Sequence, residues 1–188
     1  MDARTYLEIL HTAERLKDTP RHCTTSLRRT ESVAEHSWRL SLMALLLRHE
    51  FPEADIGKVT AMCVIHDLGE CFTGDIPTFA KTDADRAGEN MLLSQWLQTL
   101  PDEIAADLTA LLHELQAQQT TEAKLCKALD KLEALIQHNE SPLDTWSENE
   151  YTLNLSYAYD KVQFSEWLTA LRNEIKNETL AKFTCEGR

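Results

Sequence analysis

The sequence predicts an all-α protein, and three observations support this fold class. The 188 residues include only five glycines and five prolines, so few positions interrupt a helix. Apolar residues recur at intervals of three and four, which is the period of an amphipathic helix. Sustained alternation of apolar and polar residues, the pattern of a half-buried strand, does not occur before residue 151. We expect one helical domain over residues 1–188, because two domains would each be small.

Six helices are expected in the first three quarters of the chain. Their ranges are 3–16, 33–50, 57–68, 83–98, 102–118 and 121–139. Ser32 is a good N-cap for the second helix, and Glu35 follows at the capping-box position, so we expect Glu35 to cap this helix rather than to bind a ligand. Pro101 marks the start of the fifth helix, since Asp102 and Glu103 follow it in the first turn, where the helix dipole favours acidic groups.

The last quarter of the chain is less regular. Tyrosine and leucine alternate between residues 151 and 159 as they would in a strand, but this stretch lies between helical segments and would have no strand to pair with. We therefore expect it to be mostly helical, and we expect a final helix near 164–181. These C-terminal helices, in residues 140–188, would pack on the rest of the domain and either cover the site or form a dimer surface.

Charge and hydropathy exclude two classes of partner. The formal charge is −12, whereas binding to long nucleic acid depends on Lys and Arg neutralising phosphates. The longest apolar run, residues 42–47, is far shorter than the ~20 residues that cross a membrane, and residues 1–4 do not open a signal peptide. We therefore expect a cytoplasmic protein without a membrane partner. The five cysteines include no CxxC pair, so we expect neither a disulfide framework nor a thiolate zinc site.

A basic segment stands out against this acidic background. Five Lys and Arg residues lie between residues 15 and 29. They fit a rim that attracts a phosphate and an ordinary solvated loop equally well. His22 lies inside the segment and is a candidate substrate contact. Surface or packing roles are expected for four other histidines, His11, His49, His113 and His138.

Four polar residues in apolar helical contexts predict a metal site. His36 lies on the apolar face of the second helix, and His66 continues the apolar face of the third. Asp67 follows His66 directly, and Asp130 lies beside the apolar stripe of the sixth helix. A single histidine on such a face is more often hydrogen-bonded within a core, but a buried carboxylate is costly unless it is paired or bound to a metal. Four such residues on three segments therefore favour one divalent ion.

The donor types narrow the choice of metal. Two imidazole nitrogens and two carboxylate oxygens suit Mn, Fe, Co, Ni or Zn better than Ca or Mg. We place the metal-site core at about residues 30–135. Glu70 follows His66 by four residues, so a continuing helix would turn its carboxylate toward the same site as a proton donor or acceptor; a solvated helix-end group is the alternative.

The strings around these residues resemble a known family. The order His36, His66-Asp67, Asp130 resembles the H…HD…D pattern of HD-domain phosphohydrolases. Three strings are similar to the branch of bacterial 5′-deoxynucleotidases and their eukaryotic HD-domain-containing relatives: RTESVAEHS at 29–37, IHDLGECFTGDIPT at 65–78 and EAKLCKALDKLEA at 122–134. The similarity covers roughly residues 5–140, and the second string is specific.

This resemblance implies an all-helical fold that binds one divalent metal. The implied ligands are His36, His66, Asp67 and Asp130. The implied reaction is hydrolysis of deoxyribonucleoside 5′-monophosphates to a deoxyribonucleoside and phosphate, and members are often homodimers.

The same match implies roles for further residues. Glu70 and Asp75 would act in catalysis, and Arg21 would orient the phosphate. The nucleotide would be contacted by the turn Asp75, Ile76, Pro77 and Thr78. In the bacterial nucleotidase a Trp follows the Arg and helps to reject the ribose 2′-hydroxyl, whereas His22 follows Arg21 here, so sugar selectivity stays open.

Two other functions remain open on the sequence. One is an HD phosphohydrolase that acts on another nucleotide phosphoester, namely a nucleoside triphosphate, a cyclic nucleotide or a guanosine alarmone. The other is a metal- or nucleotide-binding regulator without turnover. Intact Glu70 and Asp75 argue against the regulator, because a binding protein has no need of proton-transfer groups.

Overall fold

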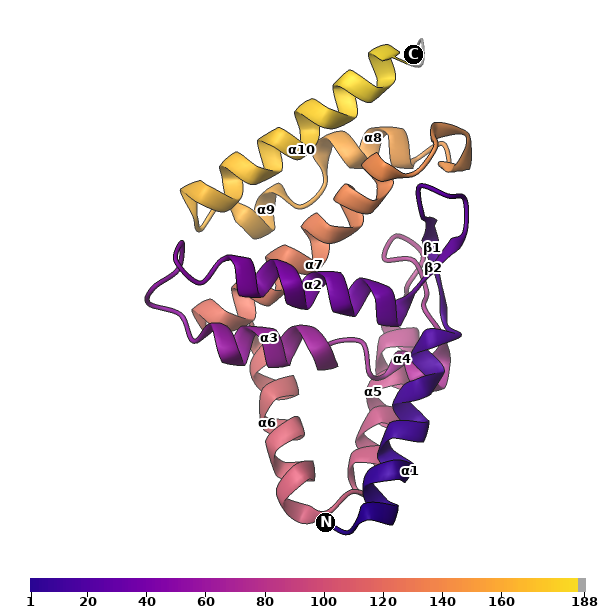
Figure 1. Ribbon diagram of the computed structural model, residues 1–188, viewed down its shortest axis with the longest axis vertical. Helices are drawn as coiled ribbons and strands as arrows, with labels where there is room; N and C mark the ends of the chain where they lie inside the picture. Colours follow the sequence, from indigo (N-terminus) through magenta and orange to yellow (C-terminus); the bar gives the residue numbers. More distant parts are fainter. Residues whose placement is uncertain (186–188) are drawn as a thin grey trace.

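The computed structural model describes residues 1–185, so residues 186–188 of the expected domain lie outside the described part. Within that part the fold is helical apart from one two-stranded ribbon, which confirms the predicted all-α class (Figure 1). The α-helices are α1 (Ala3–Ala13), α2 (Val33–Leu46), α3 (Ile56–Ile65), α4 (Glu70–Thr73), α5 (Asp83–Leu97), α6 (Asp102–Ala117), α7 (Thr121–Glu140), α8 (Glu150–Ser156), α9 (Tyr159–Val162) and α10 (Glu166–Cys185). There are also two short 3-10 helices: η1 (Glu14–Lys17) follows α1, and η2 (Leu143–Thr145) lies between α7 and α8.

The helices that were predicted from a cap or from a long apolar stripe are confirmed. Ser32 caps α2, and its capping box with Glu35 is complete: the Glu35 amide donates to Ser32 Oγ at 3.3 Å, and the Ser32 amide donates to Glu35 Oε2 at 2.9 Å. Residues 151–159, expected to be mostly helical despite their alternation, form α8 and the start of α9. The final helix is confirmed as α10.

Two local features differ from expectation. The middle of the basic segment is not a loop: β1 (Pro20–Thr24) pairs antiparallel with β2 (Thr30–Ser32), and the connection between them places Arg28 at φ 63°. The helix expected over 57–68 ends at Ile65, and the chain makes a short turn before the single-turn helix α4. Short polar strands and one-turn helices lack the periodic apolar pattern from which longer elements are predicted.

The core is built around α7, which contacts α2, α3, α6 and α10. In Figure 1 this helix runs through the middle of the molecule, with α2 and α3 crossing it and α8–α10 at its C-terminal end. Leu40, Met62, Leu129 and Leu168 are fully buried members of the main apolar cluster. A second cluster lies under α5 and α6 and includes Val33 at the start of α2. Helix α2 therefore packs on both clusters, through Val33 at its start and Leu40 further along.

Within residues 1–185, no helix is both long enough and apolar enough to cross a bilayer.

Candidate metal centre and adjoining cavity

The structure brings the four predicted metal ligands together from three helices. His36 comes from α2, His66 and Asp67 come from the turn directly after α3, and Asp130 comes from α7. The Nε2 atoms of His36 and His66 are 3.2 Å apart, and Asp67 Oδ2 is 2.9 Å from His66 Nε2. Asp130 Oδ1 lies 3.5 Å from His36 Nε2. One donor atom each from His36, His66 and Asp67 lies within 4.8 Å of the other two, which is the spacing of ligands around one ion.

Hydrogen bonds behind the two histidines fix which nitrogen faces the centre. His36 Nδ1 contacts the carboxylate of Glu133, and His66 Nδ1 donates to the carbonyl oxygen of Cys63 at 2.9 Å. Each Nδ1 therefore carries a hydrogen, and each Nε2 is the nitrogen that faces the centre. The two Nε2 atoms, 3.2 Å apart, repel each other unless a proton or a cation lies between them. This arrangement fits a metal ion by the chemistry of its donors.

The two aspartates are ionised at neutral pH. Burial alone would raise the pKa of Asp67, but the neighbouring His66 lowers it. Burial would likewise raise the pKa of Asp130, and the cations of Lys131 and Lys127 lower it well below its ordinary value. Both ammonium groups contact Asp130 Oδ2, at 3.2 Å and 3.0 Å, so Oδ1 is left to face His36. The centre therefore offers two carboxylate oxygens beside two imidazole nitrogens.

Glu70 and Asp75 lie next to this cluster. Glu70 is buried at the start of α4, and its Oε2 atom has no hydrogen-bond partner within residues 1–185. Burial, and then the charges of Asp67 and Asp75, raise its pKa to about 9. Burial also raises the pKa of Asp75, which is half-buried. Lys81 Nζ approaches Glu70 Oε1 at 3.6 Å.

A cavity of about 360 Å³ adjoins the centre. Its walls include Asp67 and Asp130, together with the other predicted catalytic and substrate-binding residues, Arg21, His22, Glu70, Asp75, Ile76, Pro77 and Thr78. Leu135 of α7 and Leu153 and Tyr157 of the α8 region add an apolar wall. The C-terminal segment, whose role was left open, thus covers one side of this cavity.

Arg21 is the member of the basic segment that reaches the candidate centre. Its guanidinium lies 3.1 Å from Glu31 Oε2 and 4.0 Å from Asp67 Oδ2. Arg28 and Arg29 instead pair with Asp144 and Glu35 near the surface. The segment is therefore neither a continuous phosphate-attracting rim nor a free solvated loop.

His22 and His138 meet at a carboxylate that the sequence did not indicate. Glu150 Oε1 lies 3.0 Å from His22 Nε2 and 2.9 Å from His138 Nε2. His138 was expected to have a surface or packing role, but it also contacts Cys23 Sγ at 3.3 Å and Asn154 Oδ1 at 3.2 Å. Glu150 lies in the irregular C-terminal stretch, where no spacing connects it to a histidine of another segment.

Sequence reasoning also missed several residues closer to the centre. Glu133 follows Asp130 by three residues, so the helical period could have placed both on one face of α7. Lys127 precedes Asp130 by three residues, and Lys131 follows it directly. Lys81 follows an irregular turn, and no sequence pattern could have placed it beside Glu70.

Fold and cluster together define a helical protein with a candidate histidine–aspartate metal centre. The model of the HD domain family matches residues 13–172, and the chain therefore belongs to the HD domain family. This confirms the resemblance drawn from the sequence.

Two kinds of relative are similar to this chain. The human 5′-deoxynucleotidase HDDC2 is 31% identical over 143 residues, which cover 73% of this chain and 69% of that protein. A crystal structure from Magnetospirillum magnetotacticum, described as a predicted metal-dependent phosphohydrolase, has a TM-score of 0.81 and 26% identity and covers 95% of both chains. A conserved hypothetical protein from Pyrococcus furiosus has a TM-score of 0.66 and 29% identity, over 91% of this chain and 99% of that one.

Proposed function

We propose that this protein is a metal-dependent phosphomonoesterase that hydrolyses deoxyribonucleoside 5′-monophosphates to a deoxyribonucleoside and phosphate. The observation that carries the proposal is the convergence of His36, His66, Asp67 and Asp130 at the edge of a cavity of about 360 Å³. Membership of the HD domain family and the similarity to 5′-deoxynucleotidases support the same reaction. An apolar wall beside a charged end suits a nucleoside joined to a phosphate.

The four converging residues would hold one divalent ion. When bound there, such an ion supplies Lewis-acid polarisation of a phosphoryl oxygen and makes a water molecule more acidic. The nitrogen and oxygen donors suit Mn, Fe, Co, Ni or Zn, and the metal content of the purified protein would identify the native ion.

The chain's own cations would bind and orient the phosphate. Arg21 is buried at the cavity wall and presents a planar guanidinium, which matches phosphate oxygens in a bidentate manner. Lys127 and Lys131 also line the cavity and lie beside Asp130. Together they offset the negative charge that a dianionic phosphate would bring to a cluster of carboxylates.

Glu70 and Asp75 are the carboxyl groups of the cavity that we assign to proton transfer. Hydrolysis requires one group to take a proton from the attacking water and one to protonate the leaving 5′-oxygen. Glu70 is placed for such a transfer, because its Oε2 atom is buried at the cavity without a partner in the described residues. Asp75 opens the turn that lines the same cavity with Ile76, Pro77 and Thr78.

The test is phosphate release from a panel of substrates. Chelator-stripped protein receives Mn, Co, Zn or Mg, and each form is incubated with dAMP, dGMP, dTMP, AMP, dATP and a non-nucleotide phosphomonoester. We expect metal-dependent release from the deoxyribonucleoside monophosphates and none from Asp67→Ala, which lacks one candidate ligand. Phosphate release from AMP, compared with release from dAMP, measures how strongly the protein selects deoxyribose over ribose.

The same panel distinguishes the alternatives. Phosphate release from dATP alone would replace the proposal with a hydrolase of nucleoside triphosphates, and release from none of the substrates by metal-loaded protein would favour a binding role. We further propose that the protein is cytoplasmic and that, as the resemblance implies, it forms a homodimer; light scattering of the purified protein would measure its mass.

A further inference from the structure

Helix α2 carries apolar side chains on two opposite faces. Its inward face, which includes Leu40 and Ala44, is completely buried in the main apolar cluster. Its outward face carries Trp38, Leu42, Leu45 and Leu46, whose exposed fractions range from 41% to 71%. A surface helix is normally polar on its outer side, and a helix that is apolar all round is normally buried. Within residues 1–185, α2 therefore has no partner for its outward face.

The four exposed side chains form one continuous stripe along α2. Leu42 follows Trp38 by four residues, and Leu45 follows Leu42 by three, which places all of them on the same side of the helix. This is the spacing of the seam between two helices that pack along their length. Arg39 is the one charged residue between 37 and 47, and its guanidinium pairs with Glu133 and Glu140 of α7. The stripe is therefore apolar and suits an apolar helix as its partner.

The stripe is large enough to form the centre of a stable interface. Large side chains bury ~150–250 Å² each, so these four together expose on the order of 500 Å². A standard protein interface buries about 800 Å² on each side, with an apolar centre and a polar rim. Trp38 is 67% exposed, and tryptophan is among the residues that most often anchor an interface.

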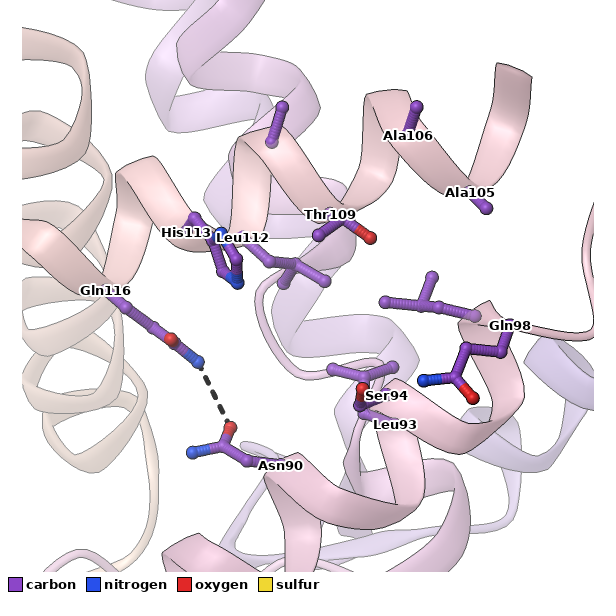
Figure 2. Close-up of a pocket in the computed structure, with 12 residues that line it drawn as sticks. Asn90, Leu93, Ser94, Gln98, Ala105, Ala106, Thr109, Leu112, His113 and Gln116 are labelled. Carbon is purple, nitrogen blue, oxygen red and sulfur yellow. Dashed lines mark hydrogen bonds between the residues drawn. The ribbon is translucent and has the colours of Figure 1, made fainter. Parts of the chain in front are cut away.

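The groove between α5 and α6 is a weaker candidate for a docking surface, although its volume is about 650 Å³ (Figure 2). Its three leucines, Leu93, Leu97 and Leu112, are each only 6–7% exposed. Most of its other lining groups are alanines, hydroxyls and amides. A few large anchors supply most of the binding energy of an interface, and the described lining of this groove exposes none.

We propose that the outward face of α2 is a homodimer interface, in which it packs on the same face of a second copy. This surface rests on the homodimer proposed above. A second copy always presents the same apolar stripe, and a twofold axis makes a stripe complementary to itself. Leu42 lies midway between Trp38 and Leu46, so the axis passes beside it. The two helices then run antiparallel, and Trp38 packs against the partner's Leu46.

This arrangement leaves each candidate active site complete within its own copy. Among the described residues, none from α2 lines the cavity of about 360 Å³ beside the candidate metal centre. His36 also belongs to α2, but it is fully buried and turns away from the stripe. A variant that separates the two copies should therefore still bind metal, and metal binding reports whether such a variant is folded.

The experiment measures the mass of the full-length protein by sedimentation equilibrium. Wild type should have the mass of two chains at micromolar concentration. Leu42→Glu and Leu42→Lys should each raise the dissociation constant of the dimer about 100-fold or more, because two like charges would meet at the axis away from water. An equimolar mixture of the two variants places opposite charges there, so it should form a mixed dimer at least tenfold more tightly than either variant alone.

Leu180→Glu is the matched control. Leu180 is a leucine of α10 with nearly the same exposure as Leu42, at 44% against 41%, and it should leave the dimer unchanged. Both Leu42 variants should bind Mn as wild type does.

Four outcomes would overturn this interface. They are a monomeric wild type, dimers of wild-type strength in both Leu42 variants, an equal weakening by Leu180→Glu, and a mixture of the Leu42 variants that stays monomeric. The second would place the interface elsewhere, for example on the exposed apolar side chains of α1, and would leave the homodimer itself standing. Failure of the nucleotidase proposal is recognised separately, by wild-type protein that releases no phosphate from deoxyribonucleotides.

Discussion

Glu133 determines which face His36 turns toward the candidate metal centre. Its carboxylate is fully buried and contacts both His36 Nδ1 and the guanidinium of Arg39. The helical period could have placed Asp130 and Glu133 on one side of α7, but the sequence could not show that the partner of Glu133 is a histidine 97 positions earlier. Polar residues in apolar helical contexts were predictable, whereas the groups behind them depend on how three helices pack.

Glu133→Gln should weaken metal binding by about tenfold or more, because the neutral amide holds the Nδ1 hydrogen of His36 less strongly than a carboxylate does. Competition with a chromophoric chelator measures the dissociation constant for Mn. Glu140→Gln is the matched control, since Glu140 also pairs with Arg39 but is exposed and does not touch His36. Equal affinities in the two variants would show that Glu133 does not position the histidine.

Glu70→Gln should keep metal binding and lower the turnover of dAMP by about 10²- to 10⁴-fold, the usual contribution of a general acid or base. The substitution keeps the size of a buried side chain, so the fold should be preserved. Metal content and kcat are measured on the same samples. Unchanged turnover would remove Glu70 from the mechanism and leave Asp75 as the proton-transfer group.

At the scale of elements, the long helices were predictable and their short connections were not. Helices α5, α6 and α7 begin within one residue of their predicted starts, because start signals mark their first turns and apolar stripes extend over several turns. The ribbon of β1 and β2 and the single turn α4 are too short to carry a period, and packing on neighbouring elements decides them. These short pieces carry Arg21, His22 and Glu70, so part of the candidate site depends on structure that periodicity does not reveal.

Gly69 provides a test of how closely α4 packs on α5. A Cβ atom at Gly69 would lie 2.6 Å from Glu89 Cγ, so Gly69→Ala must displace the side chain that pairs with Lys81. We expect a loss of about 1–3 kcal/mol in the free energy of unfolding, measured by urea denaturation. Gly88→Ala is the control, since its Cβ would meet nothing within 4 Å inside α5, and it should be neutral or stabilising. Equal effects of both changes would contradict this packing.

At the scale of the whole molecule, a charged contact joins the C-terminal helices to the rest of the fold. Glu150 of α8 lies beside His138 of α7 and His22 of β1, and Cys23 contacts the imidazole of His138. Burial alone would lower the pKa of His138, but its contacts with Cys23 and Glu150 raise it to about 10. Burial alone would raise the pKa of Glu150, but its contact with His138 lowers it to about 2.

These shifts predict how stability depends on pH. The stabilisation from His138 is complete below its ordinary pKa of 6.5 and is lost as the pH rises toward 10, whereas that from Glu150 is complete above 4.5 and is lost toward pH 2. Relative to His138→Gln, the wild type should lose up to about 3 kcal/mol of unfolding free energy between pH 6.5 and 9. Denaturant unfolding across this range measures both proteins. Parallel curves would show that the imidazolium does not stabilise the fold.

Metal titration tests the central claim most directly. Chelator-stripped protein is titrated with Mn while phosphate release from dAMP is recorded, alongside His36→Ala as a variant that lacks one candidate ligand. Our account predicts activity below about 1% without metal, a linear rise, saturation at one equivalent of bound Mn, and no recovery in the variant. Full activity in the stripped protein, or recovery of the His36→Ala variant to the wild-type level, would contradict a reaction carried by a metal at His36, His66, Asp67 and Asp130.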